Sequence, residues 1–188
     1  MFNILVLTGK STSGKDTLAK ELINNHGYQR LVTYTSRPKR DGEVDGVDYH
    51  FTSTQDFLEK INNDFFLEFR FYSTEFGIWY YGSSVLSYQE ATDKTIAILT
   101  PSGIKKLKEY NIPHTSVYIN VSDEVIKQRQ IERNDDKSEA LRRFNSDKRD
   151  FESIESQVDY IINNENRDIR DVAREIEILY RKEHKKNK

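Results

Sequence analysis

Short apolar runs of strand length alternate with longer amphipathic segments at both ends of this 188-residue chain. The runs are rich in β-branched residues and predict buried strands at residues 4–7, 95–99, 115–121 and 158–162. The longer segments have helical spacing and predict helices at residues 16–25, 101–110, 122–133, 138–156 and 168–182. Because strands that alternate with helices form a parallel sheet covered on both faces, we expect a three-layer α/β/α fold with a parallel core sheet.

The pattern changes between residues 35 and 92, just after a short strand predicted at residues 28–34. This stretch is rich in aromatic residues, Thr and Ser, and it contains the turn-forming pairs Asp41-Gly42 and Asp45-Gly46. Such a composition suits short antiparallel strands better than alternating strands and helices. A helix at residues 56–63 and a strand at residues 65–71 are expected within it. We therefore expect an inserted mixed-β subdomain within a single domain.

Composition narrows the class of protein. The sequence contains no cysteine, which excludes a disulfide framework and a thiolate metal site. It lacks the basic and apolar N-terminal pattern of a secretion signal, and the apolar run at residues 4–7 is too short to span a bilayer. A formal net charge of −2 argues against a dedicated nucleic-acid binder. We expect a cytoplasmic protein whose partners include neither nucleic acid nor membrane.

A glycine-rich loop follows the first predicted strand and leads directly into the first predicted helix. Gly9, four further residues, Gly14 and Lys15 have the spacing of a phosphate-binding loop. In such a loop, backbone N–H groups converge on an anion, the helix dipole adds positive potential, and the lysine reaches the outer phosphates. The predicted ATP-binding residues here are Gly9, Ser11, Thr12, Ser13, Gly14, Lys15, Asp16 and Thr17.

The position after the loop lysine departs from the usual pattern. A Ser or Thr hydroxyl that reaches Mg²⁺ is expected there, whereas this chain has Asp16, followed by Thr17. Both side chains offer oxygen atoms, which Mg²⁺ prefers as ligands, so either could contact the metal. Asp16 and Thr17 are therefore the candidate metal ligands.

A second phosphate-binding group is expected near the start of the inserted segment. Arg37 and Arg40 lie three residues apart on a turn-rich connector, and Tyr49 follows a glycine-bounded hairpin. Guanidinium groups match phosphate oxygens, so this grouping suits a second phosphorylated molecule. Residues 35–51 also match, nearly throughout, a segment of the guanylate kinases, and the chain resembles that family. The resemblance implies a P-loop kinase domain over residues 1–188, with a core at 1–34 and 93–188, an acceptor-binding insertion at 35–92 and a helical lid at about 129–147.

The resemblance spans almost the whole chain and implies roles for further residues. Glu68, in a segment similar to the family's F-x-E pattern, and Ser83, in one similar to its Y-Y-G-[ST] pattern, fall on positions that read the guanine base. The positions that bind the rest of the nucleoside monophosphate, chiefly its phosphate, are Thr33, Arg37, Arg40, Tyr49 and Tyr81. The lid positions that act with Lys15 on the transferred group are Arg129, Arg133 and Arg143. Asn163 falls on an asparagine near the adenine of ATP.

Two acids of the family pattern are missing just before the helix predicted at residues 101–110. Ile98 stands where an acid helps to organise Mg²⁺, and Thr100 stands where an acid assists recognition of the guanine amino group. Thr100 therefore occupies an acceptor-binding position without a carboxylate. Asp16 could compensate for the first loss by placing a charge beside the metal. An insertion at residues 74–79 could reshape the acceptor side as well.

These features predict an enzyme that uses ATP and Mg²⁺ to phosphorylate a nucleoside monophosphate, with GMP or dGMP converted to GDP or dGDP. One alternative is a ribose 1,5-bisphosphate phosphokinase, because that class commonly carries the Gly-Lys-Asp found at residues 14–16. Another is a nucleotide kinase of altered base preference. Retention of Glu68, Tyr81 and Ser83 favours a nucleotide acceptor. A third alternative, a non-catalytic binding module resembling guanylate kinases, is disfavoured by the intact Gly14-Lys15 pair.

Overall fold

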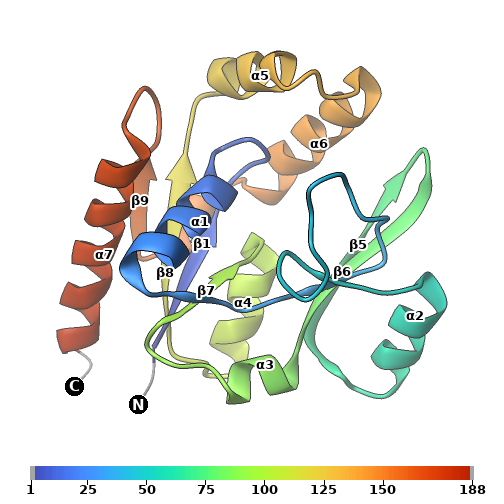
Figure 1. Cartoon of the computed structure of the whole chain (residues 1–188), viewed down its shortest axis with the longest axis horizontal. Helices are drawn as coiled ribbons and strands as arrows, with labels where there is room; N and C mark the ends of the chain where they lie inside the picture. The colour runs from blue at the N-terminus through green and yellow to red at the C-terminus, as the bar shows by residue number, and fades with distance from the viewer. Residues whose placement is uncertain (1–2, 187–188) are drawn as a thin grey trace. The chain divides into compact units, whose positions relative to one another are not determined.

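The computed structural model describes residues 3–186 of the chain (Figure 1). The chain divides into two compact units: unit 1 consists of Met1–Gln29 with Thr92–Lys188, and unit 2 of Arg30–Ala91. Unit 2 is therefore a continuous segment inserted into unit 1. Within residues 3–186, no helix is both long enough and apolar enough to cross a lipid bilayer.

Unit 1 is built on a five-stranded sheet with the strand order β2-β7-β1-β8-β9. Its strands are β1 (Ile4–Thr8), β2 (Gln29–Arg30), β7 (Thr95–Ile98), β8 (His114–Asn120) and β9 (Tyr160–Asn163). β1 pairs in parallel with both β7 and β8, and β8 pairs in parallel with β9. The predicted parallel core sheet is confirmed. Because β1 is its central strand, the loop that follows β1 lies at the carboxyl edge of the sheet, where α/β folds bind ligands.

Helices cover both faces of this sheet (Figure 1). They are α1 (Lys15–His26), α4 (Pro101–Glu109), α5 (Asp123–Glu132), α6 (Lys137–Asp150) and α7 (Ile169–Lys186), with a 3₁₀ turn, η1, at Ile154–Ser156. α1 and α7 pack on one face, in a buried cluster that includes Val117 of β8. The next residue, Tyr118, packs on Phe151 and Ile154. Since successive strand residues face opposite sides, these clusters confirm the predicted three-layer arrangement.

Two predicted elements of unit 1 differ from the structure. The strand predicted at residues 28–34 is two separate strands, β2 in the core sheet and β3 (Tyr34–Thr35) in unit 2, because the chain passes from one unit to the other at Arg30. The helix predicted over residues 138–156 ends at Asp150. Ser153 then takes a left-handed conformation, with φ of 60°, before η1. A residue in the left-handed conformation cannot continue a right-handed helix, so the predicted helix is interrupted there.

Unit 2 contains a four-stranded mixed sheet with the order β4-β3-β6-β5. Besides β3, its elements are β4 (His50–Phe51), α2 (Thr54–Asn62), β5 (Phe66–Thr74), β6 (Gly77–Ser84) and α3 (Val85–Gln89). β3 pairs in parallel with β4 and antiparallel with β6, and β5 and β6 form an antiparallel hairpin. The insertion at residues 74–79 lies at the tip of that hairpin, where residues 75 and 76 form the turn between Thr74 of β5 and Gly77 of β6.

Aromatic packing holds α2 against this sheet. Phe57 of α2 is fully buried, and its ring centre lies 4.3 Å from that of Phe66 and 5.4 Å from that of Tyr80. Burial of such a side chain stabilises the fold by about 1.5–3 kcal/mol. Ser53 starts the helix, because its side chain accepts the Asp56 N–H at 3.0 Å. The helix therefore begins two residues before the predicted position.

Candidate functional site

The glycine-rich loop runs between β1 and α1, and its path depends on both glycines. A Cβ atom on Gly9 would lie 2.6 Å from Ser13 Oγ and 2.8 Å from the Ile119 carbonyl oxygen. Gly14 has a φ of +94°, and a Cβ atom there would lie 2.5 Å from Asn164 Nδ2. Contacts this short require the neighbouring atoms to move, and the positive φ disfavours any other residue at Gly14. The loop conformation is therefore specific to glycine at these two positions.

Two side chains from other parts of unit 1 hold this loop by its carbonyl oxygens. Arg129 of α5 donates from Nη1 to the Thr12 carbonyl oxygen at 3.1 Å and from Nη2 to the Asn164 carbonyl oxygen at 2.8 Å. Asn164 is 5 % exposed and donates from Nδ2 to the Ser13 carbonyl oxygen at 2.8 Å. Anions bind to the N–H groups of such a loop rather than to its carbonyl groups. Arg129 and Asn164 thus hold the loop through carbonyl oxygens and not through the N–H groups that an anion would bind.

Asn164, which the sequence analysis did not single out, contacts the loop, whereas its predicted neighbour Asn163 is exposed. Asn163 Oδ1 accepts the Glu165 N–H at 2.8 Å and so stabilises the turn after β9. Alternate residues of a strand face the same side, so Asn164 shares the buried side with Ile162. Extension of that alternation by two residues beyond the apolar run would have identified Asn164 from the sequence.

Two carboxylates from the helices after β8 also contact the loop. Asp147 of α6 accepts the backbone N–H of Ser11 through Oδ2 at 2.6 Å. Asp123, at the start of α5, pairs with Lys10 Nζ at 2.6 Å. Lys15 donates from Nζ to the Lys10 carbonyl oxygen at 3.3 Å. An N–H group of the glycine-rich loop is therefore bound to a carboxylate of the protein itself.

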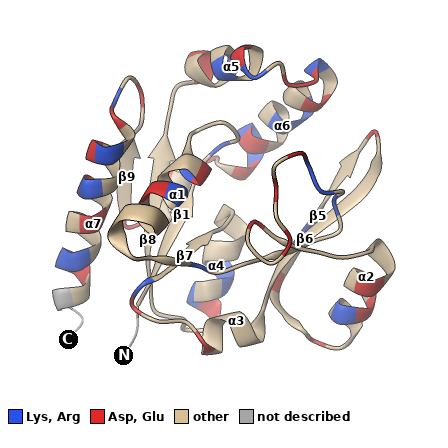
Figure 2. Ribbon diagram, in the orientation of Figure 1, with Lys and Arg blue, Asp and Glu red and all other residues tan. Residues whose placement is uncertain are grey.

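Basic and acidic residues are interspersed along α5 and α6, the two helices of the predicted lid (Figure 2). Arg143 donates from Nε to Glu139 Oε1 at 2.8 Å, and Arg142 donates to both oxygens of the same carboxylate at 2.7 and 3.0 Å. Burial acts to raise the pKa of Glu139, but the hydrogen bonds from both arginines outweigh it and lower that pKa. Arg133, at the end of α5, is more exposed, and its Nε lies 3.5 Å from Asp135 Oδ1.

In unit 2, the two predicted phosphate-binding arginines have different environments. Arg37 is 4 % exposed, and it donates from Nη2 to both oxygens of Glu43 at 2.7 and 3.0 Å and from Nη1 to the Pro38 carbonyl oxygen at 2.6 Å. The same carboxylate accepts the backbone N–H of Arg40 at 2.8 Å, and Arg40 is exposed. Burial acts to raise the pKa of Glu43, but these hydrogen bonds outweigh it and lower that pKa. Glu43 therefore neutralises Arg37 and fixes the turn that carries Arg40.

Two predicted aromatic residues lie beside Arg37. The Arg37 Cζ atom is 5.5 Å from the ring centre of Tyr49, and that ring centre is 6.2 Å from the ring centre of Tyr81. Thr33 lies just before β3, and its carbonyl oxygen accepts the His50 N–H at 2.8 Å. The structure thus brings Arg37, Tyr49 and Tyr81 together and places Thr33 where β3 and β4 meet.

Glu68 and Ser83 are paired across the β5–β6 hairpin. Ser83 Oγ donates to Glu68 Oε1, and the hydroxyl of Tyr88 on α3 lies 2.9 Å from the same serine oxygen. Burial raises the pKa of Glu68, although the Ser83 hydrogen bond and the charge of Arg70 oppose that effect. Tyr88 was not predicted, because nothing in the local pattern of residues 85–89 shows that this short helix returns to the hairpin.

The remaining predicted residues lie in unit 1. Thr100 caps α4: its Oγ1 accepts the Gly103 N–H at 3.3 Å and lies 2.9 Å from Ser102 Oγ. Asp16 and Thr17 are both exposed on the first turn of α1, and both carry the oxygen donors that suit Mg²⁺. Residues 3–186 contain no cluster of three or more His, Cys, Asp or Glu side chains that could hold a metal.

Known proteins of one family match this chain over most of its length. The sequence model of the family described as guanylate kinase matches residues 1–181. A guanylate kinase from Sulfurimonas denitrificans is 32% identical over 184 residues, covering 94% of this chain and 85% of that protein. One from Helicobacter hepaticus is 36% identical over 140 residues, covering 71% of this chain and 68% of that protein. The crystal structure of guanylate kinase from Anaplasma phagocytophilum has a TM-score of 0.72 at 26% identity, covering 97% of this chain and 86% of that chain.

Proposed function

The chain belongs to the guanylate kinase family and transfers a phosphoryl group from ATP to GMP to form GDP, and we propose that unit 1 binds ATP and unit 2 binds GMP. The observation that carries this proposal is the loop between β1 and α1, whose path depends on Gly9 and Gly14. A loop of this kind directs backbone N–H groups at phosphate. Unit 2 supplies arginines and a partly buried carboxylate, which suit a nucleoside monophosphate.

We assign the phosphates of ATP to the N–H groups of residues 11–17 and to the Lys15 ammonium. On binding, the Ser11 N–H exchanges the Asp147 carboxylate for a phosphate oxygen. Arg129 and Asn164 support the proposal, because they hold the loop in shape before ATP arrives. A preformed site avoids the cost of ordering the loop during binding.

The reaction needs no covalent enzyme intermediate. In phosphoryl transfer the protein aligns donor and acceptor and neutralises the charge on the equatorial oxygens of the transferred group. We assign that role to Lys15, Arg133 and Arg143, with Arg129 acting through the loop that it holds. Movement of α5 and α6 over the substrates also excludes the water that would otherwise hydrolyse ATP.

We further propose that Mg²⁺ is held beside this loop by Asp16 or Thr17 together with phosphate oxygens and water. Bound there, the metal supplies positive charge that neutralises the outer phosphates. Because Ile98 carries no acid, Asp16 is the carboxylate that this chain offers next to the loop lysine. A weaker Mg²⁺ affinity of the ATP complex in Asp16→Ala than in Thr17→Ala, measured by calorimetry, would identify the metal ligand.

On the acceptor side we assign the phosphate of GMP to Arg40, Tyr49 and Tyr81. Arg37 lies behind them, because its guanidinium is buried and already bonded to Glu43. Arg40 is exposed on the turn that Glu43 fixes, so its side chain can extend to a ligand. A guanidinium binds phosphate through two parallel hydrogen bonds, which gives both affinity and orientation.

We assign the guanine base to Glu68. Guanine presents two neighbouring donors, the ring N1–H and the 2-amino group, and an ionised carboxylate accepts from both. Thr100 supplies no second carboxylate, and its hydroxyl already caps α4. Base choice in this chain therefore depends mainly on Glu68 and on the residues that hold it, among them Ser83.

A coupled assay of ADP release tests this proposal with GMP, dGMP, AMP, CMP, UMP, dTMP and ribose 1,5-bisphosphate as acceptors. We expect GMP to be preferred, and Glu68→Gln to lower the GMP kcat/KM by roughly tenfold or more, because the amide nitrogen faces the donors of guanine. Faster turnover of ribose 1,5-bisphosphate, unchanged by Glu68→Gln, would contradict the assignment of a nucleotide acceptor.

A further inference from the structure

A buried tyrosine stands behind the carboxylate that we assign to the guanine base. Tyr88 lies on α3, is 2 % exposed and contacts Ser83, whose hydroxyl in turn donates to Glu68. We propose that Tyr88 is a positioning residue for base recognition, which acts through Ser83 to orient the Glu68 carboxylate. The inference rests on the proposed function, since it takes guanine as the group that Glu68 binds.

The direction of each hydrogen bond follows from the number of protons available. Above the pKa of Glu68 its carboxylate is ionised and only accepts, so Ser83 then uses its single hydroxyl proton to donate to Glu68. The 2.9 Å contact between the Ser83 and Tyr88 oxygens then has one arrangement, in which Tyr88 donates. The chain of hydrogen bonds therefore runs from Tyr88 to Ser83 to Glu68. A hydroxyl that accepts a hydrogen bond becomes a stronger donor, so Tyr88 strengthens the bond between Ser83 and Glu68.

Burial keeps water from replacing the hydroxyl groups of this chain of hydrogen bonds. Ser83 is 0 % exposed, so water has no access to replace the Tyr88 hydroxyl when the protein is folded. Glu68 is only partly buried, which leaves its carboxylate within reach of a ligand. With Oε1 bonded to Ser83, the carboxylate cannot rotate freely about its last torsion, and its remaining lone pairs point in a defined direction.

The direction of these lone pairs matters because guanine and adenine present different groups to a carboxylate. Guanine places two donors side by side, whereas adenine places a ring acceptor beside its amino group. A carboxylate that is well oriented accepts both guanine donors and repels the adenine acceptor. A carboxylate that rotates gains less from guanine and excludes adenine less completely. Tyr88 therefore contributes to specificity without contact with the base.

Substitution Tyr88→Phe tests this inference, because it removes the hydroxyl and keeps the ring. We expect the KM for GMP to rise roughly three- to tenfold, with kcat and the KM for ATP little changed. The ratio of kcat/KM for GMP to that for AMP should fall by a similar factor. Tyr28→Phe is the matched control: Tyr28 is also 2 % exposed, and among the described residues its hydroxyl has no hydrogen-bond partner. An unchanged GMP KM and ratio in Tyr88→Phe would overturn the inference.

Two further measurements separate positioning from a purely structural role. In a Ser83→Ala background, Tyr88→Phe should have no additional effect on the GMP KM, and an additive effect would overturn the inference. The acidic limb of kcat/KM for GMP should move to higher pH in Tyr88→Phe, because a weaker Ser83 bond raises the pKa of Glu68. Arg70 of β5, the charged group that lowers that pKa, is unchanged in the variant.

If Tyr88→Phe does not fold, as judged by thermal unfolding, replacement of Tyr88 by 3-fluorotyrosine gives the opposite test. Fluorine makes the hydroxyl a stronger donor, so the acidic limb should move to lower pH, and an unmoved limb would overturn the inference.

Wild-type protein that does not use GMP would overturn the proposed function and this inference with it. A GMP preference that survives Tyr88→Phe intact would overturn the inference alone.

Discussion

Lys15 holds its ammonium group against its own loop, where Nζ donates to the Lys10 carbonyl oxygen at 3.3 Å. This is a single long hydrogen bond to a neutral group, and a phosphate oxygen offers a shorter, charge-assisted one. Arg37 is the opposite case, because its guanidinium is buried and bonded to the Glu43 carboxylate. The first cation is free to transfer to a substrate, and the second mainly holds the structure around it.

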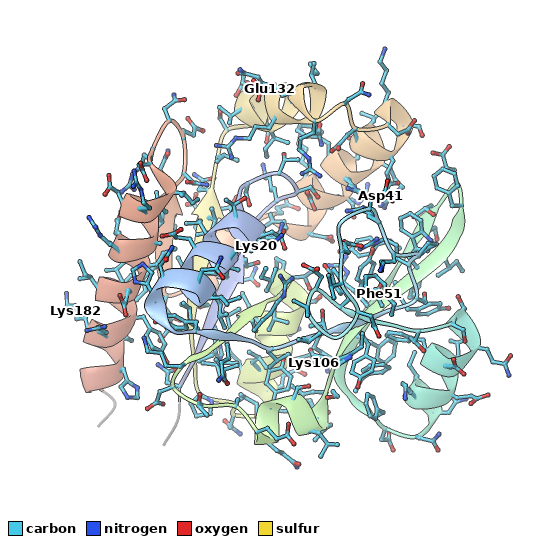
Figure 3. All side chains as sticks on the ribbon, in the orientation of Figure 1. Lys20, Asp41, Phe51, Lys106, Glu132 and Lys182 are labelled. Atoms are coloured by element: carbon cyan, nitrogen blue, oxygen red, sulfur yellow. The ribbon has the colours of Figure 1, made fainter. Side chains whose placement is uncertain are left out.

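Lys15→Ala should lower kcat by roughly a hundredfold or more, because it removes a preorganised charge beside the transferred group. The free energy of unfolding should change little, since the side chain is only partly buried. Steady-state assays with GMP and thermal unfolding measure the two effects. Lys20→Ala, at an exposed position on the same helix (Figure 3), is the control and should keep full activity. A Lys15→Ala chain as active as that control would contradict the assignment.

Arg40→Ala should raise the KM for GMP by about tenfold or more and leave the KM for ATP nearly unchanged, because a bidentate phosphate contact is lost on the acceptor side alone. The neighbouring exposed residue offers a control, Lys39→Ala, which removes the same charge from the same turn. Titration of each substrate at saturating concentration of the other separates the two constants. Equal weakening of GMP and ATP would argue that Arg40 does not belong to the acceptor site.

At the scale of elements, α6 presents a carboxylate to the phosphate-binding loop. Asp147 occupies the Ser11 N–H and carries the same sign of charge as the phosphates of ATP. Asp147→Asn should therefore tighten ATP binding by roughly three- to tenfold, because the competing anion is removed while the helix is kept. Isothermal calorimetry at constant Mg²⁺ gives the Kd. Glu152→Gln removes one negative charge from an exposed position just beyond α6 and is the control.

Weaker ATP binding in Asp147→Asn would contradict this expectation and would indicate that the carboxylate takes part in the bound complex. The comparison with Glu152→Gln distinguishes a local effect of Asp147 from a general change in net charge. Since the Ser11 contact is short, at 2.6 Å, the local effect should dominate at physiological salt, where charges farther apart than about 8 Å are screened.

Elements with a regular apolar pattern, such as β8 and α7, could be predicted from the sequence. The strands β2, β3 and β4 could not, because each has two residues and exists only through pairing with other strands. The residues of the candidate site differ in the same way in how far the sequence predicts them. Lys15 belongs to a local loop pattern, whereas Asp147 and Asn164 reach that loop across 136 and 151 positions of sequence. Contacts at such separations depend on the tertiary fold, which a local pattern does not contain.

At the scale of the whole molecule, Glu177 of α7 ties together three parts of unit 1. Its carboxylate is bonded to His26 Nδ1 at 2.7 Å, Lys94 Nζ at 3.3 Å and Arg181 Nη2 at 2.7 Å. Burial acts to raise the pKa of Glu177, but these bonds outweigh it and lower that pKa from 4.5 to about 2. A carboxyl group whose pKa is lower in the folded state stabilises the fold above its unfolded pKa, and this contribution is lost as the pH falls through the folded pKa.

The free energy of unfolding of the wild type should therefore fall between pH 4.5 and about 2 more steeply than that of Glu177→Gln. Urea unfolding at several pH values measures both slopes. Glu175→Gln is the control, because Glu175 lies on the same helix, its side chain is 43% exposed, and it pairs with Arg167. Equal slopes for Glu177→Gln and the wild type would contradict the expectation.

The point at which unit 2 is inserted has a consequence for how this architecture can change. Just outside that segment, the Gln29 N–H donates to the Lys94 carbonyl oxygen at 2.7 Å, so the chain leaves unit 1 and returns to it at adjacent positions. A segment with neighbouring ends can be excised, or replaced by one of another length, without stretching the backbone that remains. If unit 2 binds GMP, as we propose, recombination confined to residues 30–91 would change the acceptor of the phosphoryl group and leave the sequence of unit 1 unaltered.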